Sequence, residues 1–117
     1  MYVREKEWIG VDFDGTLISN TSGEYHGPPH IGIPVPTMVE RVKRWLSEGK
    51  TVKIFTARAV HFPHDPSLED SFKTWCLEHI GQALEVTNIK TPAMIELWDD
   101  RAVGVVRNTG RIKSDFN

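Results

Sequence analysis

Short apolar runs along the chain, each ending in polar residues or glycine, predict five strands. Runs of about four to eight residues with such boundaries are typical of strands that are buried in a sheet. The predicted strands cover residues 8–11, 51–55, 84–86, 95–98 and 102–106.

Two longer segments carry apolar residues at the spacing of one helix face. Residues 37–48 form the first, with Thr37 as the expected N-cap and Glu40 three residues later, which together fit a capping box. Residues 67–80 form the second, for which we expect Ser67 to be the cap. Both segments are followed by glycine, which commonly ends a helix.

The order of these elements predicts an α/β fold. Strand, helix, strand and helix, followed by three short strands, favour a mainly parallel five-stranded sheet in a three-layer sandwich, joined by right-handed crossovers. In such sheets the ligand site lies beyond the carboxyl ends of the strands. The stretch from about residue 19 to 36 is rich in glycine and proline, so we expect a long loop there with a functional role.

Composition narrows the class of protein. The 117 residues fit a single domain spanning residues 1–117, and 39% hydrophobic with 26% charged residues is ordinary for a globular chain. A net charge of −2 gives no general argument for binding nucleic acid or a membrane. The single cysteine, Cys76, excludes an internal disulfide, and the charged first residues lack a signal peptide. We therefore expect a cytoplasmic protein.

Acidic residues follow two of the predicted strands. Asp12 and Asp14 come after the first strand, and the glycine behind them lets the chain turn, so both can face one site. Asp99 and Asp100 come after the fourth strand. Four carboxylates in one place repel one another, and hard oxygen ligands of this kind suit Mg²⁺. The sequence therefore predicts a magnesium site.

Cationic and hydroxyl side chains follow the other strands. Thr56 and Arg58 end the second strand, and Lys90 lies in the loop after the third. Such donors match the oxygens of a transferring phosphoryl group. A carboxylate can also act as the nucleophile in that chemistry. We interpret Thr56, Arg58 and Lys90 as candidate substrate-binding residues, with an ion pair to an acidic residue as the alternative role of Arg58.

Together these motifs resemble the haloacid dehalogenase superfamily. The run Asp-Phe-Asp-Gly-Thr-Leu at residues 12–17 is similar to its DxDGT signature. Thr56, Lys90 and the Asp99–Asp100 pair follow in the order of the other three motifs. Thr-Ala-Arg and Asp-Asp-Arg, at residues 56–58 and 99–101, resemble small phage and bacterial members, including the phosphatase half of phage polynucleotide kinases.

The resemblance implies a phosphatase mechanism. Asp12 would attack phosphorus and form an aspartyl-phosphate, and Asp14 would protonate the leaving oxygen and then activate water. Thr56 and Lys90 would hold the phosphoryl oxygens as catalytic and binding residues.

The same resemblance implies a ligand set and a strand order. Mg²⁺ would be bound by Asp12, by the backbone carbonyl of Asp14 and by Asp100, with Asp99 a direct or outer ligand. The sheet order would be 5-4-1-2-3.

The chain is too short for the cap domain that most relatives carry, so a capless member is expected. An open site of that kind suits a phosphorylated macromolecule or nucleic-acid end as substrate. The protein would act as a monomer, or as a homodimer in which a second subunit covers the site, without contact to a membrane.

Two other functions fit the same residues. A receiver-like phospho-acceptor domain also uses clustered acids, a threonine, a lysine and Mg²⁺, although it carries its acid pair before a lone acceptor. A phosphotransferase on the same scaffold would pass the phosphoryl group to an acceptor other than water.

Four histidines show ligand-like spacing: His26 with His30, and His61 with His64. Their loops lack accompanying cysteines, so we interpret them as loop residues, some of them near the substrate.

Overall fold

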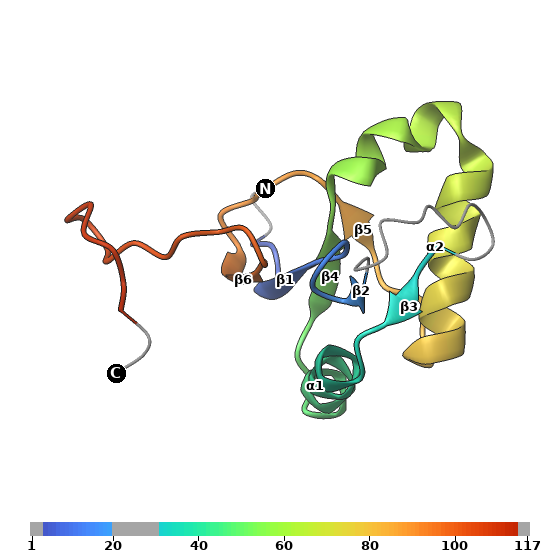
Figure 1. The fold of residues 1–117 in the computed structure, drawn as a ribbon, viewed down its shortest axis with the longest axis horizontal. Helices are drawn as coiled ribbons and strands as arrows, with labels where there is room; N and C mark the ends of the chain where they lie inside the picture. The colour runs from blue at the N-terminus through green and yellow to red at the C-terminus, as the bar shows by residue number, and fades with distance from the viewer. Residues whose placement is uncertain (1–3, 20–30, 115–117) are drawn as a thin grey trace.

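The computed structural model describes residues 4–19 and 31–114, which form an open α/β fold (Figure 1). The strands are β1 (Trp8–Asp12), β2 (Ile18–Ser19), β3 (Ile33–Pro34), β4 (Val52–Phe55), β5 (Val86–Thr87) and β6 (Met94–Trp98). The helices are α1 (Pro36–Ser47), the 3-10 helix η1 (Ala57–His64) and α2 (Pro66–His79).

The main sheet is parallel and has four strands. Its order is β5-β4-β1-β6, while β2 and β3 form a separate antiparallel pair. In β1, Val11 lies beside Ile54 of β4 on one side and Trp98 of β6 on the other. The first four predicted strands therefore have the neighbours that the motif resemblance implied.

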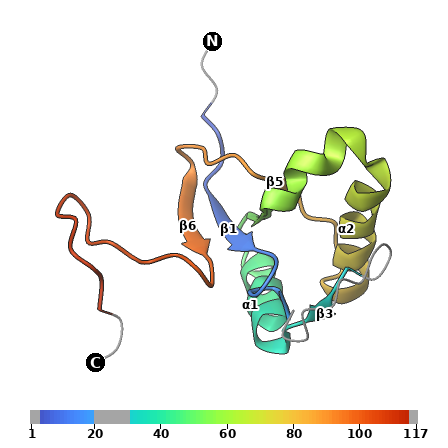
Figure 2. The ribbon, with the colours of Figure 1, turned by 45° about the horizontal axis from the view of Figure 1, so that its top comes forward.

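The predicted fifth strand is wrong. Residues 102–106 belong to an arm, residues 101–114, that runs away from the sheet (Figures 1 and 2). Val105 pairs with Ile112 across a turn of the arm itself, and the backbone N–H of Val106 donates to the carbonyl of Arg111. A valine-rich run favours extended backbone without specifying its partner, so this segment pairs locally.

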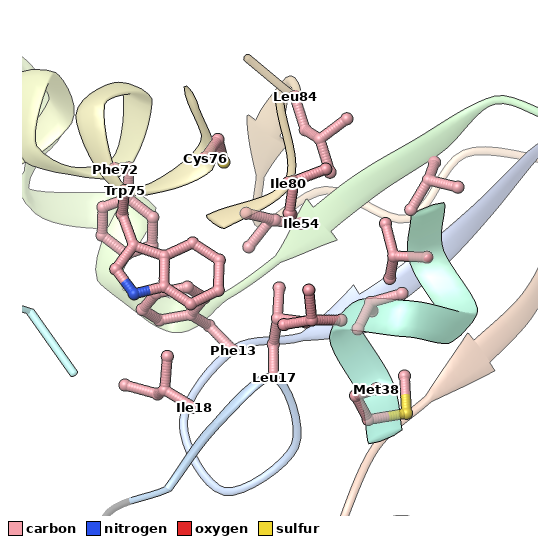
Figure 3. Packing of buried hydrophobic residues seen from close by; sticks show 14 of the residues in the cluster. Phe13, Leu17, Ile18, Met38, Ile54, Phe72, Trp75, Cys76, Ile80 and Leu84 are labelled. Carbon is pink, nitrogen blue, oxygen red and sulfur yellow. The ribbon is translucent and has the colours of Figure 1, made fainter. Parts of the chain in front are cut away.

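One hydrophobic cluster joins the sheet to both α-helices. Alternate sheet residues such as Val11 and Ile54 belong to it, together with Val42 of α1. Figure 3 shows Ile54 and Phe72 of α2 among its side chains. Within the described part of the chain, both α-helices thus cover the same face of the sheet. The structure differs here from the predicted three layers, because residues 88–93 are too few to carry a crossover helix over the other face.

Both helices begin at a proline, and the N-cap of each lies two residues before the predicted one. Helix α1 starts at Pro36 without a side-chain cap, so the expected capping box at Thr37 is wrong. In α2 the cap is Asp65, whose carboxylate accepts from the Leu68 N–H at 3.2 Å, instead of Ser67. Proline suits the first helical position because its φ is already helical and it lacks an N–H group to satisfy.

No helix within residues 4–19 and 31–114 has the length and apolar character needed to cross a bilayer.

The cluster supplies a direct test of the packing. Phe72 is fully buried, with its ring 4.6 Å from that of Phe13. We expect Phe72→Ala to lower the free energy of unfolding by about 3–5 kcal/mol, because a large cavity replaces the ring. Urea unfolding measures this. Leu77→Ala on the same helix, where the side chain is 54% exposed, should change stability by less than about 1 kcal/mol. Equal losses in the two variants would contradict the packing.

Candidate active site

A hollow of about 540 Å³ lies at the carboxyl ends of β1, β4 and β6. This is the edge at which parallel sheets bind ligands. Nine residues line it: Asp12, Asp14, Phe55, Thr56, Ala57, Arg58, Asp99, Asp100 and Arg101. Six of the seven side chains that the sequence predicted for the site are among them.

Phe13 orients the two acids at the end of β1. Its ring is fully buried and packs against Phe72 and Trp75 of α2. Phe13 lies in the turn directly after β1, and its neighbours on either side, Asp12 and Asp14, both line the hollow. The carbonyl of Phe13 accepts from the N–H groups of residues 16, 17 and 18, which closes the turn behind the pair.

Three carboxylates gather at one point. Asp12, Asp99 and Asp100 each offer an oxygen, and these oxygens lie within 4.8 Å of one another. Burial raises the pKa of Asp12 to about 7, with a hydrogen bond to Asp100 and the charge of Asp99 adding to the effect. The two neighbouring acids disfavour the ionised form of Asp12. A cation would relieve this repulsion, so the donor set fits a divalent metal ion with oxygen preference.

A tight turn fixes Asp100 in this cluster. Thr16 donates its hydroxyl proton to the Asp100 carboxylate at 3.3 Å and accepts from the Asp100 N–H at 3.1 Å. Gly15 has a φ of +84°, and a Cβ there would lie 2.5 Å from an Asp100 carboxylate oxygen. Thr16 was not predicted as a site residue, although its place after Asp-Gly in the signature was a usable signal.

Asp14 lies outside the three-carboxylate cluster and is held by Arg58. The Arg58 Nε donates to one Asp14 oxygen at 2.9 Å, and Nη2 donates to the other. This bidentate pair joins β1 to the start of η1. Arg58 thus takes the ion-pair role, which was the alternative to substrate binding. Its partner, Asp14, is the residue expected to act as acid and base.

Thr56 is the N-cap of η1 and is almost fully buried. Its hydroxyl oxygen accepts from the Arg58 N–H at 3.2 Å, which caps the helix and leaves the hydroxyl proton available to another acceptor. The cap thus ties the position of Arg58 to that of Thr56. Residues 61–64, predicted as a loop, belong to this 3-10 helix.

Lys90 does not line the hollow. It lies exposed between β5 and β6, next to Thr91, whose hydroxyl accepts from the Trp8 indole at 3.0 Å near the start of β1. Its role in holding phosphoryl oxygens stays a prediction. Arg101 is the additional cation that lines the hollow.

The predicted histidines divide between two regions. His61 and His64 line a second hollow of about 450 Å³, which shares Arg58 with the first. His26 and His30 lie outside the described residues.

No protein-family model matches the chain. No curated protein matches it either. Among solved structures, the chain is similar to a conserved protein from Bacteroides thetaiotaomicron. The two are 25% identical, the match has a TM-score of 0.57, and it covers 87% of this chain and 82% of the other. That protein is described as conserved and no activity is named for it, so the similarity supports the α/β fold.

The carboxylate cluster should make the metal-free protein sensitive to pH. The folded-state pKa of Asp12, about 7, lies above its ordinary 3.8, so the folded protein holds this proton more tightly than the unfolded chain. The corresponding stability is fully present below about pH 4 and is lost as the pH rises toward 7. We expect Asp12→Asn to gain stability relative to the parent across this interval, and the difference to stay constant at higher pH.

Urea unfolding at a series of pH values in EDTA measures that difference. Asp70→Asn, at an exposed position of α2, is the matched control and should follow the parent at every pH. A constant difference between Asp12→Asn and the parent from pH 4 to 8 would contradict the raised pKa of Asp12.

Proposed function

We propose that the protein is a Mg²⁺-dependent phosphate monoester hydrolase that works through an aspartyl-phosphate on Asp12. The observation that carries this proposal is the cluster of Asp12, Asp99 and Asp100 at a strand-end hollow that also holds Arg58 and Thr56. The motif resemblance to the haloacid dehalogenase superfamily supports the same chemistry. It rests on the order of the motifs and on this geometry.

Asp12, Asp99 and Asp100 would hold the metal ion, with the backbone carbonyl of Asp14 as a further ligand. When bound, the ion would neutralise the carboxylates and polarise a phosphoryl oxygen. Charge neutralisation also bears on Asp12 itself. With a cation beside it, its carboxylate would ionise below pH 7 and so be available as a nucleophile.

The first step would be attack by an ionised Asp12 oxygen on phosphorus. The new bond joins Asp12 to phosphorus while the bond from phosphorus to the leaving oxygen breaks, and protonated Asp14 gives its proton to that oxygen. In the second step Asp14 takes a proton from water, and the water oxygen bonds to phosphorus. The bond between Asp12 and phosphorus breaks, which releases inorganic phosphate and restores the Asp12 carboxylate and the protonated form of Asp14.

Thr56 and Arg58 would bind the phosphoryl oxygens during both steps. The Thr56 hydroxyl has a proton to donate, and Arg58 presents several N–H groups in a planar fork. A phosphoryl dianion in the hollow would compete with Asp14 for the guanidinium group. Substrate binding would thereby loosen the Arg58–Asp14 pair and free Asp14 for proton transfer.

The leaving group would lie toward the second hollow. That hollow shares Arg58 and is lined by His61 and His64 on η1. We propose that these residues face the organic part of the substrate. The substrate would be the end of a phosphorylated macromolecule or nucleic acid.

Asp12 is the residue on which this proposal is tested. We expect Asp12→Asn to lower the hydrolysis rate of p-nitrophenyl phosphate by about 10⁴-fold or more, because the amide cannot form the acyl phosphate. EDTA should abolish turnover by the parent protein, and Mg²⁺ should restore it. Asp70→Asn is again the matched control and should retain full activity. Hydrolysis by Asp12→Asn at the parental rate would contradict the covalent mechanism.

The Arg58–Asp14 pair favours a second candidate function, a phospho-acceptor domain. A carboxylate engaged by Arg58 is poorly placed to activate water, so a phosphoryl group on Asp12 could persist. The two functions differ in the lifetime of the phosphoenzyme. Labelling with acetyl phosphate, followed by a chase, distinguishes rapid release of inorganic phosphate from a long-lived acyl phosphate.

Substitutions of Arg58 distinguish a role in binding the phosphoryl group from a purely structural role as the partner of Asp14. We expect Arg58→Gln to lower kcat/KM by about 10²-fold, because it removes a charged donor from the developing phosphoryl charge. Arg58→Lys keeps the charge and loses the bidentate fork, so its activity should fall between those of the parent and the glutamine variant. Steady-state kinetics measure both. Parental kinetics in Arg58→Gln would assign this residue to structure alone.

A further inference from the structure

We propose that the arm, residues 101–114, adds to the free edge of β6 in a second copy of the chain, and that two copies exchange their arms about a twofold axis. The inference is independent of the proposed function. It rests on the exposure of the arm, the unprotected edge of β6 and the distribution of charge between the arm and the rest of the chain.

The arm exposes apolar side chains far from the core. Val103 is 68% and Ile112 is 73% exposed, and every residue from 100 to 114 is classed as exposed. The arm is nevertheless ordered by its own contacts. Val105 pairs with Ile112, and the Lys113 N–H donates to the carbonyl of Gly104 at 2.8 Å. An exposed arm held by one bridge pair and a few backbone hydrogen bonds is marginal alone in water and gains most by joining a larger sheet.

The edge of β6 offers such a sheet. Strand β6 is hydrogen-bonded to β1 alone among the strands of the described residues, so the backbone groups on its outer side face outward. Exposed edge strands are usually blocked by lysine or proline, and β6, with the sequence Met-Ile-Glu-Leu-Trp, contains neither. Its charged residue, Glu96, accepts from the Trp98 indole of the same strand at 3.1 Å. Ile95 is 55% exposed.

The path of the chain favours a second copy over the arm's own sheet. The arm begins just after β6 and leads outward beyond the β6 side of the sheet (Figures 1 and 2). Its hairpin closes on itself at a turn around Asn108, which has a φ of +67°. A twofold axis beside β6 would let each outward arm reach the β6 edge of the other copy, and the contact would be self-complementary.

Charge favours protein over nucleic acid as the occupant. Four of the chain's fourteen lysines and arginines lie in the arm, which has no acidic residue. The rest of the chain carries ten basic against sixteen acidic residues. Glu96, Asp99 and Asp100 lie on or directly after β6, so a basic arm meets an acidic edge.

Light scattering on the full chain tests the proposal. The parent should have twice the chain mass of 13.3 kDa. The double variant V103D/V105D should have the mass of one chain, because charged side chains oppose burial of the arm. Ile95→Lys, which blocks the acceptor edge, should also halve the mass. Leu77→Asp places the same charge on an exposed apolar position of α2 and should leave the dimer intact. Circular dichroism and thermal unfolding verify that each variant folds.

Mixing the variants gives a sharper readout. V103D/V105D retains a normal edge and Ile95→Lys retains a normal arm, so together they should recover dimers joined through one of the two contacts. A parent with the mass of one chain would overturn the proposal, as would a dimer that survives V103D/V105D. A monomeric parent that shifts a DNA oligonucleotide through the arm would assign the arm to nucleic acid and equally overturn it.

Discussion

The burial of one aromatic ring determines the geometry of the whole candidate site. Phe13 is fully enclosed between the sheet and α2, with its ring 4.6 Å from that of Phe72 and 5.1 Å from that of Trp75. Rotating this residue outward would open a large cavity, so its orientation is fixed by the core. The acids on either side then have no choice of face. Packing, which involves no charge, thus holds the charged groups of the hollow in place.

The hollow concentrates charge at the expense of stability. Asp12 lies against two other carboxylates, and its raised pKa measures how poorly the folded protein tolerates its ionised form without a cation. The surroundings compensate in different ways for different acids. Thr16 holds Asp100, and the Arg58 fork holds Asp14. Asp12 has a hydrogen bond from the Phe13 backbone, but burial and the neighbouring acids outweigh it and raise its pKa, so this carboxylate gains from a bound metal ion.

The sequence predicted the parts of this structure that depend on local pattern. Four strands and the gathering of acids at the strand ends follow from apolar runs that terminate in polar residues, and the order of those strands was implied by the motif resemblance. The predicted helix starts were wrong. Helix α1 begins at a proline without a side-chain cap, and Asp65 caps α2, in place of the expected caps at Thr37 and Ser67. The pattern could not reveal that Arg58 pairs with Asp14, because the two are far apart in sequence and meet only when β4 packs beside β1.

The fifth strand failed for a reason that bears on assembly. Residues 102–106 have the composition of a strand, and the edge beside β6 that the sequence predicted for them is present and free of pairing within the described chain. Strand pattern specifies that a segment will pair, whereas the connection decides with which edge it does so.

The connection here begins with the Arg101 N–H bonded to the Asp99 carboxylate at 2.8 Å, so the first turn of the arm and a member of the carboxylate cluster share one contact. If a second copy captures the arm as we propose, the direction in which the arm leaves β6 would be fixed, and with it the orientation of Asp99. Assembly and metal binding would then stabilise the same turn, which gives a small open domain a means of ordering its site without a cap.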